Sequence, residues 1–172
     1  MATGLKAIET VYKGYRFRSR TEARWAYFMD KAGVVWTYES EGYDLDGVRY
    51  LPDFYLTKID CWLEVKGVKP DPSSPDYEKP RRLAEASGKP VYMVSGEIGP
   101  EYEITTFGRQ GWGKFRWCVC IRRGCGLVGI SRNGNGAALP CSCFRSDEFY
   151  RSDDWKVIRD ALAGARMERF GV

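Results

Sequence analysis

The sequence predicts an α/β fold built on a mixed β-sheet with helices on both of its faces. Residues 50–56 and 61–67 are apolar runs of strand composition that flank four loop residues, which is a hairpin pattern. The second of these strands is followed by a helical segment over about 76–87 and by another apolar run over 90–95. A strand-helix-strand order of this kind joins parallel strands by a right-handed crossover, so we expect both strand orientations in one sheet.

The elements that precede this unit follow from local composition. Residues 12–18 are predicted to form a short basic strand, and the next helix runs from about 21 to 32 because Gly33 suits the position that ends a helix. Residues 34–39 are β-branched and aromatic, as in a strand. Asp46-Gly47 is a turn signal in front of the first hairpin strand.

The second half of the chain has weaker patterns. The proline-rich residues 69–75 predict a loop, and the glycine-spaced residues 97–111 predict a linker or an irregular connection. A helix from Asp153 to about Phe170 has apolar residues at helical spacing, which is typical of core packing. We therefore expect a core over residues 1–96 and a second segment, cysteine-rich with a terminal helix, over residues 97–172.

Composition limits the class of protein. The 172 residues are 44% hydrophobic and 29% charged, which suits a compact domain and argues against general disorder. No apolar run approaches the roughly 18 residues that a membrane span requires, and Met1–Lys6 lacks the apolar core of a signal peptide. We expect a cytoplasmic protein without a membrane partner. The sequence contains no histidine, which excludes histidine-dependent catalysis and histidine-ligated zinc.

The predicted hairpin brings two acids and a lysine together. With residues 57–60 as the loop, Asp53 lies directly opposite Glu64, at a Cβ separation of roughly 5 Å. Like charges at that separation repel, and a divalent cation such as Mg²⁺, which prefers carboxylate oxygens, removes the conflict. Lys66 lies two residues after Glu64 and projects from the same strand face. The pattern indicates a metal site with a lysine beside it.

These residues resemble the PD-(D/E)xK nuclease superfamily. Pro52-Asp53 matches the first half of its motif, and Glu64-Val65-Lys66 matches the second half on the next strand. Together with the upstream segment Tyr15–Ala26, the pattern is similar to small phage-encoded nucleases of that superfamily over about residues 12–96.

The resemblance implies a restriction-endonuclease-like core and a Mg²⁺- or Mn²⁺-dependent endonuclease that cleaves DNA. If the chain is phage-encoded, its location is the cytoplasm of a bacterial host. Asp53 and Glu64 are then the metal ligands, and the backbone carbonyl of Val65 is a further one. Lys66 is expected to position the attacking water or to help deprotonate it. Glu22 matches by position the first-helix glutamate that completes the acidic site of the superfamily.

Glu22 also has a structural interpretation. Ser19-Arg20-Thr21-Glu22 fits a capping box, in which Ser19 caps the helix and Glu22 reaches back to the cap. However, Glu22 shares an apolar helix face with Trp25, Ala26 and Met29, so its carboxylate is expected to point toward the sheet. The capping role and the active-site role are compatible, and the sequence leaves both open.

A run of basic residues lies before this helix, interleaved with aromatic residues, a combination that suits a phosphate backbone with bases nearby. The alternative is a solvated edge strand whose charges prevent aggregation. The candidate nucleic-acid-binding residues are Lys13, Arg16, Arg18, Arg20 and Arg24.

Five of the six cysteines gather in the second segment. Four thiolates hold a structural Zn²⁺ in a tetrahedral array, and we expect Cys120, Cys125, Cys141 and Cys143 to be the ligands, with Cys118 in reserve. The alternative is a set of reduced, partly buried thiols. Cys61 stands apart on a predicted strand and is expected to belong to the core.

The sequence as a whole predicts a Mg²⁺-dependent deoxyribonuclease. One alternative is a non-catalytic DNA-binding or regulatory protein on the same fold, and another is an interaction protein that uses the cysteine segment to bind a partner. The intact Asp-Glu-Lys set favours the enzyme. RNA as the substrate, the DNA structure that is cleaved and the oligomeric state, including a homodimer, are left open.

Overall fold

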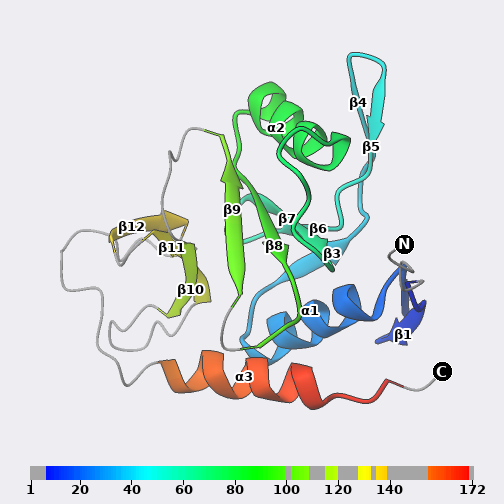
Figure 1. Cartoon of the computed structure of the whole chain (residues 1–172). Coiled ribbons are helices and arrows are strands. Elements are labelled where there is room, and N and C mark those ends of the chain that lie inside the picture. Colours follow the sequence, from blue (N-terminus) through cyan, green and yellow to red (C-terminus); the bar gives the residue numbers. More distant parts are fainter. Residues whose placement is uncertain are drawn as a thin grey trace.

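A five-stranded mixed sheet forms the centre of the structure (Figure 1). The computed structural model describes residues 7–99, 102–108, 115–119, 128–132, 135–138 and 155–170. The strands of the sheet, in spatial order, are β3 (Trp36–Tyr38), β6 (Phe54–Leu56), β7 (Cys61–Lys66), β8 (Val91–Ser95) and β9 (Glu103–Phe107). The β7–β8 pair is parallel and the other pairs are antiparallel, so the predicted α/β class with a mixed sheet is confirmed.

The β6–β7 hairpin has the predicted loop and register. Leu56 pairs with Cys61 and Phe54 pairs with Leu63 across the four loop residues. The loop closes with a 2.8 Å hydrogen bond from the Asp60 N–H to the Leu56 carbonyl. One step further along this register, Asp53 comes to lie at the position opposite Glu64.

The predicted strand-helix-strand unit is also present. The connecting helix α2 (Pro75–Ser87) begins with Pro75 in its first turn, where the missing N–H costs nothing. Gly88 ends it in the left-handed conformation, with φ of 70°. The chain then enters β8, which pairs in parallel with β7 so that Glu64 lies beside Met93.

Helices cover both faces of the sheet (Figure 1). Side chains alternate along β7, so that Leu63 and Val65 pack toward α1 (Arg20–Lys31) and α3 (Trp155–Met167). Trp62 belongs to the second hydrophobic cluster, on the α2 side. The same alternation places Glu64 and Lys66 on the α2 side of the sheet.

The sequence predicts one strand over residues 12–18, but these residues belong to two strands. β1 (Thr10–Tyr12) and β2 (Tyr15–Phe17) make an antiparallel hairpin. Lys13 and Gly14 both have positive φ, 49° and 80°, which is the geometry of a two-residue turn that matches strand twist. A second hairpin, β4 (Tyr43–Leu45) and β5 (Val48–Tyr50), turns at Asp46-Gly47 as predicted.

The predicted irregular connection over residues 97–111 contains a strand, so this prediction was wrong. Glu103–Phe107 pairs with β8 as the edge strand β9, and its Ile104 and Phe107 side chains are buried. Its β-branched residues, Ile104 to Thr106, were the local signal for a strand. The expected boundary at residue 96 therefore falls between two paired strands of one sheet.

A smaller three-stranded sheet follows, made of β10 (Phe115–Val119), β11 (Val128–Arg132) and β12 (Asn135–Ala138). Trp117 of β10 is fully buried, and its ring lies 5.2 Å from that of Phe28 and 6.4 Å from that of Trp25. Described residues beyond residue 96 thus belong to the same hydrophobic cluster as α1.

The predicted C-terminal helix is present as α3. Its Ile158, Leu162 and Ala165 are buried against the main cluster, and Phe170 packs on it after the helix ends, whereas Met167 is exposed. No helix among the described residues is long and apolar enough to cross a bilayer.

Candidate active site

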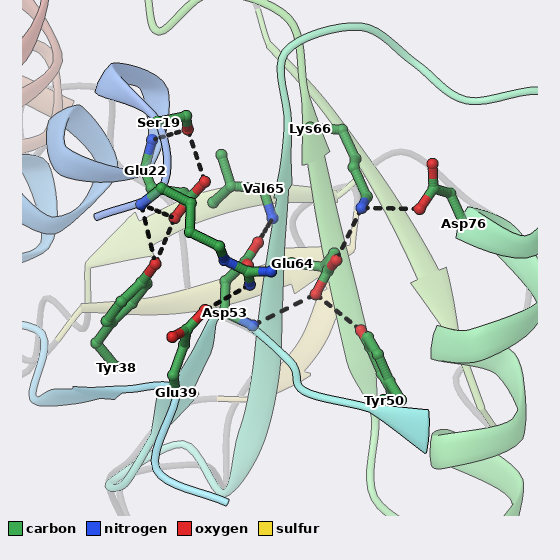
Figure 2. Close-up of polar contacts among 11 residues, drawn as sticks. Ser19, Glu22, Tyr38, Glu39, Tyr50, Asp53, Glu64, Val65, Lys66 and Asp76 are labelled. Carbon is green, nitrogen blue, oxygen red and sulfur yellow. Dashed lines mark hydrogen bonds and ion pairs between the residues drawn. The ribbon is translucent and has the colours of Figure 1, made fainter. Parts of the chain in front are cut away.

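Asp53 lies at the point where β6 and β7 separate, and it is 3% exposed. The main-chain N–H of Val65 donates to its Oδ2 at 2.7 Å, and Nη2 of Arg18 donates to its Oδ1 at 2.9 Å. Its own N–H points to Oε2 of Glu64 at 3.4 Å. The predicted juxtaposition of Asp53 and Glu64 therefore occurs (Figure 2).

Glu64 is 4% exposed and is held from two sides. The hydroxyl of Tyr50, at the end of β5, donates to its Oε2 at 2.8 Å. The ammonium group of Lys66 lies 3.0 Å from its Oε1. The β4–β5 hairpin thus contributes a buried donor to the acid on β7.

Lys66 lies between two carboxylates. Its Nζ donates to Oδ1 of Asp76, in the first turn of α2, at 3.1 Å (Figure 2). Burial alone would lower the pKa of Lys66, but the charges and hydrogen bonds of Glu64 and Asp76 outweigh burial and raise it. The lysine is therefore a cation and a hydrogen-bond donor at neutral pH.

The acids repel each other, as the sequence predicted. Burial raises the pKa of Asp53 well above its usual range, and the charges of Glu64 and Glu22 raise it further. The Val65 N–H and the Arg18 guanidinium act in the opposite direction without cancelling the effect. A buried pair of carboxylates in this state fits a divalent cation, which would neutralise both.

The carbonyl of Val65 lies on the same side of β7 as the Asp53 carboxylate. In a β-strand the N–H and C=O of one residue point to the same side. The Val65 N–H points to Asp53, so its carbonyl faces the same side of β7 as that carboxylate. No β6 residue pairs with Val65, because the β6–β7 pairing ends at Phe54 and Leu63.

Glu22 makes the contacts of a helix cap. Its N–H donates to Oγ of Ser19 at 3.2 Å, and the Ser19 hydroxyl donates to Oε1 of Glu22 at 2.7 Å. The Tyr38 hydroxyl, at 2.6 Å, and the Arg18 N–H, at 3.2 Å, donate to Oε2. Figure 2 shows Asp53 between this group and the Glu64 group. The capping interpretation is thus confirmed, and Glu22 is also near enough to affect Asp53.

Among the residues that the structure describes, no three His, Cys, Asp or Glu side chains gather closely enough to bind a metal by themselves. Glu22 is turned toward its cap and Tyr38. The groups that could hold a cation together are therefore Asp53, Glu64 and the Val65 carbonyl.

The five basic candidates differ in their partners and in their exposure. Arg18 contacts Asp53 and, at 2.6 Å, Glu39. Lys13 pairs with Asp30 at 2.8 Å, and Arg16 is an exposed side chain 3.5 Å from Glu9. Arg20 is exposed at the start of α1, and Arg24 is half-buried in the same helix.

The predicted zinc ligands Cys120, Cys125, Cys141 and Cys143 lie outside the described residues. The backbone of Cys118 belongs to β10. Cys61 is fully buried in the main cluster, as predicted, and burial raises the pKa of its thiol, so it is an unreactive core residue.

Four residues of the site were missed at the level of sequence: Tyr38, Glu39, Tyr50 and Asp76. Tyr50 comes three residues before Asp53 in a strand-like run, but no periodicity identifies it as a donor to Glu64. Asp76 lies in the first turn of a helix, where acids are common because they complement the helix dipole. Its position therefore did not mark it as a site residue.

No protein-family model, curated protein or solved structure matches this chain.

Proposed function

We propose that this chain is a divalent-metal-dependent deoxyribonuclease with a restriction-endonuclease-like core of the PD-(D/E)xK type. The observation that carries the proposal is the convergence of Asp53, Glu64 and Lys66 at one end of the β6–β7 hairpin. Two buried carboxylates with a lysine beside them form an arrangement that a hairpin built only for stability would avoid. Metal-dependent cleavage of a phosphodiester uses a cation site and a nearby positive group, and this arrangement offers both.

Asp53, Glu64 and the Val65 carbonyl would hold Mg²⁺ or Mn²⁺. When bound, the cation would supply a Lewis acid that makes water a better nucleophile and neutralises charge on the phosphate. Tyr50 keeps Glu64 oriented through its 2.8 Å hydrogen bond, and the Val65 N–H does the same for Asp53.

Lys66 would act through its charge and its N–H donors. Glu64 and Asp76 raise its pKa, so it is not a proton acceptor in the metal-free protein. A protonated lysine at this position can donate to the attacking water or to a phosphate oxygen and stabilise the charge that develops there. Arg16 and Arg20, both exposed near the start of α1, are available to contact flanking phosphates. A cytoplasmic location is part of the same proposal.

The test is incubation of labelled duplex, branched and single-stranded DNA with Mg²⁺, Mn²⁺ or EDTA. The parent should cleave at least one of these DNAs when metal is present. Lys66→Ala should lower the rate by at least about a hundredfold. The matched control is Lys156→Ala, an exposed lysine on α3 that pairs with Asp160 at 2.9 Å, and it should leave the rate unchanged. A parent that cleaves none of these DNAs in either metal would contradict the proposal.

The second candidate function is a non-catalytic DNA-binding or regulatory protein. The contact between Arg18 and Asp53 favours it, because an arginine already supplies the positive charge that a metal would bring. DNA affinity without cleavage in Mg²⁺ or Mn²⁺ would support this candidate over the enzyme.

A further inference from the structure

The guanidinium group of Arg18 bonds to an oxygen of the Asp53 carboxylate, which is one of the groups that would hold the proposed metal ion. Its Nη2 donates to Oδ1 of Asp53 at 2.9 Å, and the same nitrogen lies 2.6 Å from Oε1 of Glu39. The other oxygen of Asp53 accepts the Val65 N–H. Oδ2 is thus directed at the main chain, and the partner of Oδ1 is the Arg18 side chain.

Arg18 is the exposed partner of this ion pair, whereas Asp53 is the buried one. The Arg18 side chain is 56% exposed and that of Asp53 is 5% exposed. Departure of the guanidinium alone would leave Asp53 as an uncompensated buried charge, so a cation must take its place as it leaves. The Arg18 backbone is held independently, since its N–H bonds to Glu22 and Tyr38. An exchange therefore requires movement of the side chain alone.

Glu39 provides a second anchor for the guanidinium. Its φ of 43° is rare for a residue with a side chain. Its N–H donates to the Asp53 carbonyl at 2.9 Å, which fixes the two acids side by side. After leaving Asp53, the Arg18 side chain would remain tethered next to the site by Glu39.

We infer that Arg18 is a displaceable counter-ion, which neutralises Asp53 in the metal-free protein, yields Oδ1 to a divalent cation, and then pairs with a phosphate of the nucleic acid. The inference rests on the proposed function. A cation about 2.1 Å from Oδ1 and a guanidinium 2.9 Å from the same atom would repel each other strongly. A phosphate is a suitable new partner, because its oxygens match the planar donor fork of arginine.

The first arm of the test is calorimetry of Mn²⁺ binding without DNA. Arg18→Gln removes the competing charge and should bind Mn²⁺ about tenfold more tightly than the parent, or better. Arg18→Lys keeps a charge and should retain the weaker affinity of the parent. The matched control is Arg81→Gln, in an exposed side chain on α2 that pairs with Glu85 at 2.9 Å, and its affinity should equal that of the parent.

The second arm needs no substitution. NMR spectra of the ¹⁵N-labelled parent report how fast the guanidinium N–H protons of Arg18 exchange with water. The ion pairs of Arg18 should slow this exchange, and addition of Mg²⁺ should make it faster. This measurement keeps the inference open to refutation even if Arg18→Gln fails to fold.

The third arm measures the phosphate contact in a Lys66→Ala background, to prevent cleavage. In this background, the further substitution Arg18→Gln should weaken the binding of a labelled DNA. The loss of affinity should be at least about fivefold greater in Mg²⁺ than in EDTA. Equal losses under both conditions would mean that Arg18 contacts phosphate regardless of metal, which overturns the exchange.

The outcomes separate the two proposals. A parent that binds no Mn²⁺ overturns the proposed function and this inference together. A parent that binds Mn²⁺, with no gain of affinity in a folded Arg18→Gln or no change in the Arg18 signal, overturns only the exchange and leaves the nuclease proposal standing.

Discussion

Val65 and Asp53 are joined by a 2.7 Å hydrogen bond from the main-chain N–H of the first to Oδ2 of the second. The bond lies just past the end of the β6–β7 pairing, where the two strands separate. It orients a buried carboxylate with a backbone N–H, which only proline among the substitutions of Val65 would remove. The carboxylate and the Val65 carbonyl are therefore held on the same side of β7.

Asp53→Asn should stabilise the metal-free protein at neutral pH. Burial, Glu64 and Glu22 hold the pKa of Asp53 above its ordinary value, so the native state binds this proton more tightly than the unfolded chain. The stabilisation from Asp53 is then fully present below the unfolded pKa and is lost as pH rises through the native pKa. The advantage of Asp53→Asn should be small in acid and grow toward neutral pH, measured by urea unfolding in EDTA.

The control for Asp53→Asn is Asp46→Asn, at an exposed turn position, which should shift stability by less than about 0.5 kcal/mol at any pH. Added Mn²⁺ should reverse the order of the parent and Asp53→Asn, because the carboxylate binds the cation better than the amide does. Equal stabilities at every pH would contradict the repulsion between the acids.

Tyr50→Phe should destabilise the protein by about 1.5–3 kcal/mol, because it removes a buried hydrogen bond to a charged carboxylate. The hydroxyl donates to Glu64 at 2.8 Å and the tyrosine is buried. Tyr43→Phe is the matched control, since its hydroxyl bonds to Glu41 at an exposed position. Denaturant unfolding of both variants in EDTA measures the difference. Similar losses in the free energy of unfolding would show that the Tyr50 hydrogen bond stabilises the protein no more than the exposed one does.

Substitutions at Glu22 and Ser19 separate the capping role from the active-site role. Ser19→Ala removes the cap and should cost about 1 kcal/mol of stability, with the cleavage rate of the folded protein unchanged. Glu22→Gln keeps the shape of the side chain but removes the charge next to Asp53, and it should lower cleavage at least about tenfold. Full activity of a folded Glu22→Gln would leave capping as the only role of Glu22.

The zinc hypothesis is tested by elemental analysis of protein purified without added metal. We expect about one Zn²⁺ per chain, bound by four thiolates. Cys125→Ser should lose the zinc and some stability, because structural zinc contributes folding free energy. Cys61→Ala, in the buried core, should lower stability but keep the zinc. Zinc-free protein in which the thiols other than Cys61 react readily would contradict the hypothesis.

Elements governed by neighbouring residues were predictable from the sequence. Asp46-Gly47 specifies a hairpin turn because both residues tolerate positive φ. The loop over residues 57–60 sets the register of β6 and β7, and with it the position of Asp53 opposite Glu64. The helix ends at Gly33 and Gly88 follow from the same conformational preference.

Two strand predictions were wrong where local signals were weak. Lys13-Gly14 is a less common turn pair than Asn-Gly or Asp-Gly, so β1 and β2 were read as one strand. The strand β9 has only five residues and follows a glycine-rich stretch. Its structure is stabilised by pairing with β8, which is a contact that local composition does not reveal.

The sequence by itself determined the pair of acids and the lysine, because their spacing on one hairpin fixes their register. Only the tertiary structure decided what surrounds them. Tyr50 reaches Glu64 from 14 positions away, Asp76 reaches Lys66 from 10, and Arg18 reaches Asp53 from 35. A buried carboxylate must find donors, but which donors it finds depends on how separate elements pack against the hairpin, and strand or helix periodicity carries no information about that packing.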